Sequence, residues 1–356
     1  MGRILWRSLL VVVLGAIYRP CGAADKINFA YSALSGLQAP LWVAKEAGFF
    51  RKHDIDAQVL FIVGGRVISQ AMFAGELQMG LSSMAALLQA NAAGGDLTYV
   101  AYFGSKTDYA LFSTKDITDI KQLRGKRLGI GQFGGGPDFA SRIVLEKHGL
   151  IPDKDVRIVQ MLVPDSGRLA ALQAGVIESI LLQAPTSLRA VSLGFNQLLD
   201  YSNELLFPLA SLTTTRAYIR QSPAVVKRVV KAHLDAVRFM FANEDATLKI
   251  LARYTKINDT AFLREYHRKI ILPRLSQNLA PDRAAIEFIL DVERKRNPAA
   301  GKLKAESFFD ATFIDELRKD EVVKPYLAKF AGQTGIYLVG KAQEKTTTFR
   351  THKGHG

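Results

Sequence analysis

The stretch LGIGQFGGGPDFASRIVL, residues 128–145, decides which α/β fold the chain adopts. Gly129, Gly131 and Gly134 spell G-x-G-x-x-G, the pattern with which dinucleotide-binding folds hold a pyrophosphate. In those folds the helix begins inside the motif, so that the third glycine packs the helix against the strand. Here Pro137 favours the first helical position, which places the start of the helix after the glycines.

The acidic residue that a dinucleotide site requires is also misplaced. That residue follows the second strand and binds the ribose hydroxyls. Asp153 and Asp155 have the right spacing but precede the strand expected at residues 156–162, and Asp165 lies too far beyond it. The motif match is therefore accidental, and the sequence does not predict a dinucleotide enzyme.

A glycine-rich loop before a helix still makes chemical sense. Glycines uncover main-chain N–H groups, and the helix dipole favours an anion at that end. This dipole contributes about 0.3–1 kcal/mol, whereas micromolar binding needs about 8 kcal/mol. We therefore expect the loop to be one half of a binding site that other groups complete.

The same alternation of strand and helix extends along the chain on both sides of this stretch. Separated strands of this kind predict βαβ units, an α/β class with mostly parallel sheets, and ligands at the carboxyl ends of the strands. From about residue 212 onward the pattern changes to long amphipathic helices. The expected strands are 27–31, 57–63, 79–81, 97–103, 128–130, 156–162 and 179–182, and the expected helices are 40–47, 66–73, 83–92, 137–148 and 166–174.

The first 24 residues predict an export signal. Arg3 and Arg7 precede an apolar run at 9–17, which is too short to span a bilayer, and small residues follow. Cys21 could be a lipid acceptor, although the residues before it fit that pattern badly. It is the only cysteine, so the mature chain would have no disulfide, thiolate metal site or cysteine nucleophile. At the other end, residues 331–356 are expected to form a flexible tail.

The formal net charge is +14, from 47 basic and 33 acidic residues. A basic excess either steers anionic ligands or forms a solvated exterior. The basic residues lack the interleaved aromatic residues of a single-strand binder, so no nucleic-acid partner is expected.

Catalytic motifs are missing from the sequence. It has no G-x-S-x-G, no H-E-x-x-H and no G-x-x-x-x-G-K-[ST], and its histidines are scattered singly. The polar residues that stand out lie at expected strand ends, where they suit hydrogen bonding to a small ligand. They are Ser32, Ser35, Ser82, Ser83, Asp165 and Gln183.

Three segments resemble the periplasmic substrate-binding proteins of ABC transporters, in the branch that binds nitrate, sulfonates, taurine and thiamine pyrimidine precursors. They are AYSALSGLQAPLWVAKEAGFFRKHDIDAQVLFIVGG, LRGKRLGIGQFGGGPDFASRIVLEKHGLIPDKDVRIVQM and GRLAALQAGVIESILLQAP, and the resemblance covers about residues 26–330. It implies two lobes, each a mostly parallel sheet flanked by helices, with the ligand cleft between them. The first lobe would be residues 25–113 plus 214–330 and the second 114–213, with crossings near 112–115 and 212–215.

The same resemblance implies a monomeric, exported periplasmic receptor that passes a small ligand to a membrane permease and uses no cofactor. An anion suits the glycine loop and the basic excess, whereas an aromatic heterocycle suits the aromatic residues; Arg66 and Arg168 cannot be assigned from spacing. For Trp42 and Phe103 a place in the core is an equal alternative, and for Asp138 the alternative is that it only favours the first turn of its helix. The implied ligand-binding residues are Ser35, Gln38, Trp42, Gly64, Gly65, Ser82, Ser83, Met84, Tyr102, Phe103, Phe133, Gly134, Gly135, Gly136, Asp138, Asp165 and Gln183.

Enzymes also occur in this branch, which leaves an exported enzyme of the same fold as the alternative. The branch's pyrimidine synthase relies on a cysteine-rich iron motif, and this sequence has no cysteine after residue 21. We therefore expect a receptor and not an enzyme.

Overall fold

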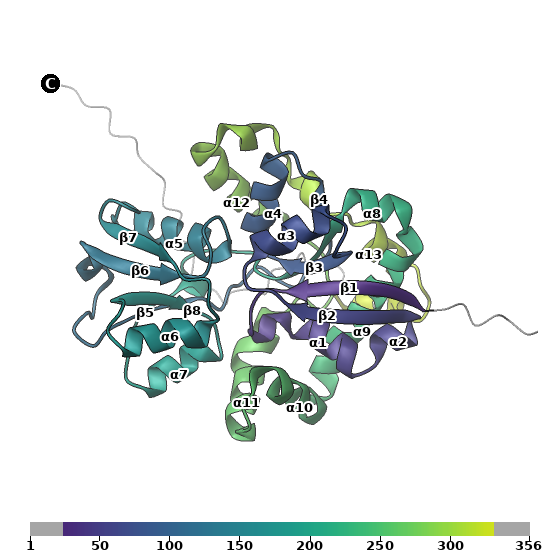
Figure 1. Cartoon of the computed structure of the whole chain (residues 1–356). Coiled ribbons are helices and arrows are strands. Elements are labelled where there is room, and N and C mark those ends of the chain that lie inside the picture. The colour runs from purple at the N-terminus through teal and green to yellow at the C-terminus, as the bar shows by residue number, and fades with distance from the viewer. Residues whose placement is uncertain (1–23, 331–356) are drawn as a thin grey trace, which may run out of the picture.

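The computed structural model describes residues 24–330, which form two five-stranded sheets with helices on their faces (Figure 1). The expected tail and nearly all of the expected export signal, Cys21 included, lie outside the described residues. Within the described range, no helix is long and apolar enough to cross a bilayer.

The first sheet has the strand order β2-β1-β3-β10-β4. Strand β1 pairs in parallel with β2 and β3, and β10 pairs antiparallel with β3 and β4, so four of the five strands run the same way. The expected α/β class is confirmed, with one reversed strand in the sheet. The strands are β1 (Asp25–Tyr31), β2 (Ile55–Phe61), β3 (Met79–Ser82), β4 (Leu97–Ala101) and β10 (Ser211–Thr215).

The second sheet repeats this arrangement with the order β7-β6-β8-β5-β9. Strand β6 pairs in parallel with β7 and β8, and β5 is the reversed strand between β8 and β9. The strands are β5 (Ala110–Ser113), β6 (Lys126–Ile130), β7 (Val156–Gln160), β8 (Ser179–Leu182) and β9 (Asn196–Asp200).

The chain crosses between the two sheets twice. It leaves the first sheet after β4 and enters the second at β5, and it returns between β9 and β10. The crossings expected at 112–115 and 212–215 coincide with β5 and β10, so each crossing lies a few residues earlier than expected. No α-helix lies between β4 and β5 or between β9 and β10, so the alternation of strand and helix gave no signal for the reversed strands; β9 is also absent from the expected strands. We call the part built on the first sheet the first lobe and the part built on the second sheet the second lobe.

The helices follow the sequence pattern closely, and Pro137 lies in the first turn of α5, as expected. The helices are α1 (Ala39–Glu46), α2 (Phe49–Lys52), α3 (Gly65–Phe73), α4 (Met84–Ala92), α5 (Gly136–Lys147), α6 (Asp165–Gln173), α7 (Thr186–Ser192), α8 (Arg216–Gln221), α9 (Pro223–Ala242), α10 (Glu244–Thr255), α11 (Thr260–Tyr266), α12 (Arg283–Arg296), α13 (Thr312–Leu317) and α14 (Lys324–Leu327). Short helical turns are η1 (Gly36–Gln38), η2 (Ile120–Leu123), η3 (Tyr201–Asn203), η4 (His267–Ile271), η5 (Leu272–Arg274), η6 (Pro298–Lys302), η7 (Ala305–Phe308) and η8 (Ala328–Phe330).

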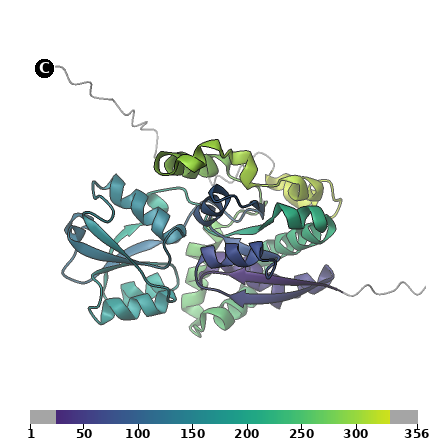
Figure 2. The same cartoon turned by 45° about the horizontal axis from the view of Figure 1, so that its top comes forward.

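The long helices after β10 pack on the first lobe. In α9 the apolar residues Val226, Val229 and Val230 are fully buried, as the helical spacing predicts. The C-terminal helices lie along one side of the molecule (Figure 2). Helix α12 reaches the second lobe, where Arg296 pairs with Glu146 of α5 at 2.7 Å.

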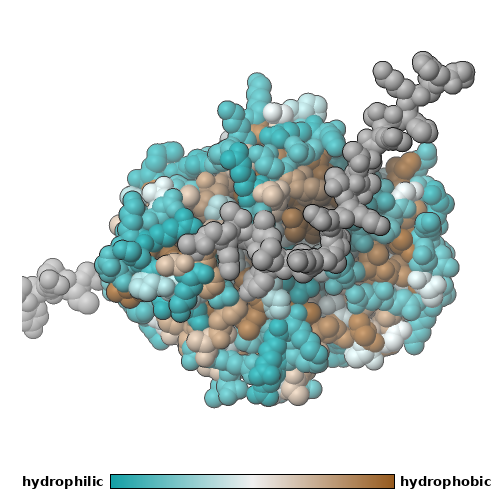
Figure 3. All heavy atoms as spheres, turned by 180° about the vertical axis from the view of Figure 1, so that it is seen from behind, coloured by the Kyte–Doolittle hydropathy of each residue, from teal (hydrophilic) through white to brown (hydrophobic). Residues whose placement is uncertain are grey.

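Basic residues of α9 pair with acidic residues on the surface. Lys227 lies 2.8 Å from Glu316, and Lys231 lies 2.5 Å from Asp320. Such pairs contribute about 0–1 kcal/mol each. On the face shown in Figure 3, hydrophilic side chains alternate with apolar ones. The basic helix face is thus a solvated and paired surface.

Candidate functional site

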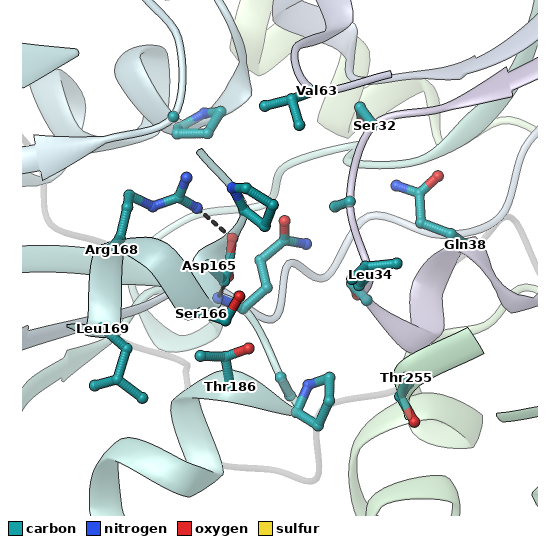
Figure 4. A pocket seen from close by; sticks show the side chains of 18 of the residues that line it. Ser32, Leu34, Gln38, Val63, Asp165, Ser166, Arg168, Leu169, Thr186 and Thr255 are labelled. Carbon is teal, nitrogen blue, oxygen red and sulfur yellow. Dashed lines mark hydrogen bonds and ion pairs between the residues drawn. The ribbon is translucent and has the colours of Figure 1, made fainter. Parts of the chain in front are cut away.

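A cavity of about 760 Å³ lies between the two lobes. It is lined by the loops that follow β1, β2 and β3 in the first lobe and β6, β7 and β8 in the second (Figure 4). All six loops stand at the carboxyl ends of their strands, where open α/β sheets bind ligands. Side chains of Ser32, Leu34 and Val63 face those of Asp165, Ser166 and Thr186 across the cavity.

Asp108, in the first crossing, joins the two lobes beside the cavity. Its carboxylate accepts hydrogen bonds from Ser35 Oγ of the first lobe at 2.7 Å and from Gln183 Nε2 of the second at 2.9 Å. Burial raises the pKa of Asp108 to about 6, against the opposing effect of these hydrogen bonds and of Arg274. Desolvation thus exceeds the stabilisation that the bonds provide to the charged form.

Tyr266, at the end of α11, forms a second bridge between the lobes. Its hydroxyl donates to the carbonyl of Ala184 in the second lobe at 2.7 Å and accepts from the amide of Gly36 in the first. The side chain is buried. Both bridges therefore tie the relative position of the lobes to residues next to the cavity.

The glycine loop of residues 131–136 contacts the first lobe closely. Gln132 Oε1 accepts a hydrogen bond from the amide of Arg66 at 3.2 Å. Gly134 has φ +72°, and a Cβ added there would overlap Gln89 Oε1 of α4. A Cβ on Gly136 would come within 2.9 Å of Tyr109 Oη and 3.1 Å of Ser83. These glycines allow the two lobes to approach each other.

Three of the six amides of this loop donate hydrogen bonds within the second lobe. The amide of Phe133 donates to Gln160 Oε1 at 2.7 Å, and that of Gly134 donates to Asp138 Oδ2 at 2.9 Å. The amide of Gly135 donates to the carbonyl of Gln132 at 3.3 Å. The expectation that the glycines leave these amides uncovered for a ligand is therefore wrong at these three positions.

Arg168 is a buried cation of the cavity wall, and its donors are already used. Its guanidinium pairs with Asp165 and donates to the carbonyls of Val163 at 2.7 Å and Leu181 at 3.3 Å. Asp165 also accepts from the amide of Gln183 at 2.6 Å. The pair is therefore an internally neutralised part of the wall (Figure 4).

About half of the ligand-binding residues expected from the resemblance come together at this cavity. Gln38 stands out because it is only 2% exposed, and its Oε1 has no hydrogen-bond partner within the described part of the chain. The expected residues that line the cavity are Ser35, Gln38, Gly64, Gly65, Ser83, Gly135, Gly136, Asp165 and Gln183.

The expected aromatic contacts belong to the core and do not line the cavity. Trp42 points away from it and stacks on Tyr254, with ring centroids 4.7 Å apart. Phe103 stacks on the buried His233 at 5.7 Å. Trp42 and Phe103 are therefore core residues, the alternative that the sequence left open for them. Three further expected residues, Ser82, Met84 and Tyr102, are buried outside the lining.

The remaining expected residues lie next to the cavity. Phe133 is 40% exposed but is not part of the lining, and Gly134 faces α4 instead. Asp138 binds the loop amide and pairs with Arg142 at 2.7 Å. Asp138 therefore stabilises the glycine loop, which is a larger role than favouring the first turn of its own helix.

The residues 24–330 contain no group of three or more His, Asp or Glu side chains placed to hold a metal ion. The buried imidazole of His233 is not a candidate base, because burial lowers its pKa to about 4 and phenylalanine rings surround it. The arrangement offers hydrogen-bonding groups and apolar walls for a bound molecule.

Two α/β lobes joined by two crossings, with a cavity between the carboxyl ends of their sheets, define the periplasmic-binding-protein fold. Solved structures of this fold superpose on the chain. The aliphatic sulfonate-binding protein SsuA of Escherichia coli is 17% identical, with a TM-score of 0.65 over 82% of this chain and 99% of SsuA. The nitrate-binding protein NrtA of Synechocystis PCC 6803 is 15% identical, with a TM-score of 0.71 over 85% of this chain and 91% of NrtA.

The chain belongs to the NMT1/THI5-like family, whose sequence profile matches residues 37–247, more than half of the chain. A Brucella abortus (strain 2308) protein that is named as a binding protein is 25% identical over 264 residues, 71% of this chain and 79% of its own length. The Saccharomyces cerevisiae 4-amino-5-hydroxymethyl-2-methylpyrimidine phosphate synthase THI5 is 28% identical over 117 residues, 32% of this chain and 34% of the enzyme. Fold and family together support a solute-binding role.

Proposed function

We propose that the protein is the solute-binding receptor of an ABC importer, which captures a small molecule between its lobes and delivers it to a membrane permease. The observation that carries this proposal is the cavity of about 760 Å³ whose walls come from both lobes. Cavities of about 300–1,000 Å³ are typical of small-molecule sites. The names of SsuA and NrtA as periplasmic binding proteins support it, and they favour an exported periplasmic location.

The bridges beside the cavity suggest how binding would be signalled. Ser35 and Gln183 meet on the carboxylate of Asp108, and Tyr266 joins Gly36 to Ala184. A ligand that contacts both lobes favours the conformation in which they are close, by as much as its affinity differs between the two conformations. A permease that distinguishes these conformations would then respond to the loaded receptor alone.

An exported enzyme of the same fold is the second candidate, because the relatives include a yeast synthase. That likeness covers about a third of each chain, whereas the likeness to the Brucella binding protein covers most of both. Of the described residues, the two acidic side chains that line the cavity already have partners, since Asp165 pairs with Arg168 and Asp259 accepts the amide of Phe262 at the start of α11, and no histidine lines it.

The two candidates differ in what happens to the bound molecule. A thermal-shift screen of a metabolite library, followed by mass spectrometry of each hit before and after incubation, separates them. A receptor raises its Tm with a compound that is recovered unchanged. Chemical conversion of a hit would support the enzyme and contradict the receptor, and a library without any stabilising compound would also count against the receptor.

Several classes of small molecule are candidates for the ligand. A sulfonate, a nitrate or a carboxylate fits the names of the structural neighbours, and a pyrimidine fits the name of the yeast enzyme. The contacts within the cavity narrow this choice further.

A further inference from the structure

We infer that the cavity takes an uncharged amphipathic organic molecule, whose hydrogen-bonding head pairs with the carboxamide of Gln38 and whose body lies against aliphatic walls. This inference rests on the proposed receptor function and specifies its ligand class. Four observations carry it: the occupied donors of Arg168, the occupied amides of three residues in the glycine loop, the unpartnered Oε1 of Gln38 and the apolar side chains that line the cavity.

The buried wall offers no free positive charge to an anion. The guanidinium of Arg168 is held by Asp165 and by the carbonyls of Val163 and Leu181. To bind an anionic head it would have to give up Asp165, which would leave that carboxylate unpaired near the buried Asp108. Binding of an anion would therefore break the neutral Arg168–Asp165 pair and leave an excess of negative charge in the cavity wall.

Three amides of the glycine loop are also unavailable to an anion. The amides of Phe133, Gly134 and Gly135 already donate within the second lobe. Arg189 and Lys256 also line the cavity, but both are exposed, where water and salt screen their charge. The cations near the cavity thus stand at its solvent edge and not at its buried end.

Gln38 supplies an uncharged polar group to the cavity, in place of the free cation that an anion would require. It lines the cavity, is 2% exposed, and its Oε1 has no hydrogen-bond partner within residues 24–330. An unpaired buried acceptor is costly, so a ligand donor that pairs with Oε1 once the carboxamide turns this oxygen toward the cavity is favoured. A carboxamide both donates and accepts, so it matches a head that carries a donor beside an acceptor and has no charge of its own.

The rest of the cavity suits an apolar body. Leu34, Val63 and Leu169 line it, and Phe61 and Val163 do so while remaining 38% exposed. The last two residues come from opposite lobes and add exposed apolar surface to the lining, beside the exposed Arg189 and Lys256. A three- or four-oxygen anion would leave most of about 760 Å³ to water, whereas an alkyl or aryl body would cover these side chains.

Two matched series of probes test the inference by titration calorimetry: primary n-alkyl carboxamides and n-alkyl sulfonates with four, six and eight carbons. We expect each carboxamide to bind at least tenfold more tightly than the sulfonate of equal length. We also expect affinity to rise about fourfold per added methylene. Gln38→Leu should lower carboxamide affinity about tenfold and leave sulfonate affinity unchanged.

Gln58→Leu is the matched control, because Gln58 is exposed on β2 and does not line the cavity. Sulfonates that bind more tightly than carboxamides would overturn the inference and leave the proposed receptor function intact. If Gln38→Leu and the control bind carboxamides with the same affinity, the inferred pairing of the ligand head with Gln38 is contradicted. If neither series binds at millimolar concentration, the inference is contradicted, whereas the proposed receptor function is contradicted only if the metabolite library also contains no stabilising compound.

Discussion

Replacing Asp108 with asparagine should remove a pH dependence from the stability of the protein. Burial raises the pKa of this carboxyl from 3.8 to about 6. One pKa unit corresponds to about 1.4 kcal/mol, so the difference amounts to about 3 kcal/mol. Because the folded state holds the proton more tightly, this stabilisation is complete below pH 4 and is lost as the pH rises to about 6.

The assay is urea unfolding of the wild type and of Asp108→Asn at pH 4, 5, 6, 7 and 8. Asparagine is neutral throughout, so the stability difference between the two proteins should shift by about 3 kcal/mol between pH 4 and pH 7, in favour of the variant at the higher pH. Above pH 7 the difference should be constant. The exposed Asp56→Asn controls for the amide substitution, and the titration of groups such as His233 cancels because both proteins contain them.

Parallel pH profiles for the wild type and Asp108→Asn would refute this reasoning. They would mean that the hydrogen bonds from Ser35 and Gln183, at 2.7 and 2.9 Å, balance the desolvation of the carboxylate, so that folding leaves its pKa unchanged. A profile that falls with decreasing pH in the wild type alone would show the opposite sign, a carboxylate stabilised by its partners.

Two further predictions concern the cavity wall. Gly134→Ala should lose about 1–2 kcal/mol because of its φ of +72° and should also weaken binding of a stabilising compound, since its Cβ meets Gln89 across the lobes. Gly175→Ala, at φ +68° in open space, should lose similar stability in urea unfolding without any change in affinity; equal affinities would contradict the role of Gly134 as an inter-lobe contact. Arg168→Gln should lower the free energy of unfolding by about 1–3 kcal/mol, because it leaves the half-buried Asp165 without its charged partner. Unchanged stability together with lost affinity for sulfonates would show instead that Arg168 serves the ligand.

The sequence predicts most of the fold because strands and helices alternate with clear stops. Pro137 and the glycines before it place the start of α5 correctly. Three strands escape prediction. The reversed strands β5 and β10 are short, buried and not directly preceded by an α-helix, and β9 is only partly buried. The crossings between the lobes were therefore expected several residues too late.

The site is less predictable than the fold, since burial and partners decide it. Strand-end residues such as Ser35 and Gln183 reach the cavity, as the rule for α/β sheets predicts. Trp42 does not, because its position on α1 points it into the core, and helical spacing alone cannot tell the two directions apart. Asp108 and Tyr266 act at the crossing and at a helix end, where the sequence pattern marks neither of them.

The central claim is that one small molecule binds between the lobes, and filling that cavity tests it most directly. Ser166 lines the cavity and is exposed to it, whereas Ala170 is an exposed position of the same helix outside the lining. Titration calorimetry with the compound that stabilises the wild type most should give one site per chain in the wild type and in Ala170→Trp, and no binding in Ser166→Trp at unchanged fold. Equal binding by Ser166→Trp and Ala170→Trp would contradict the claim.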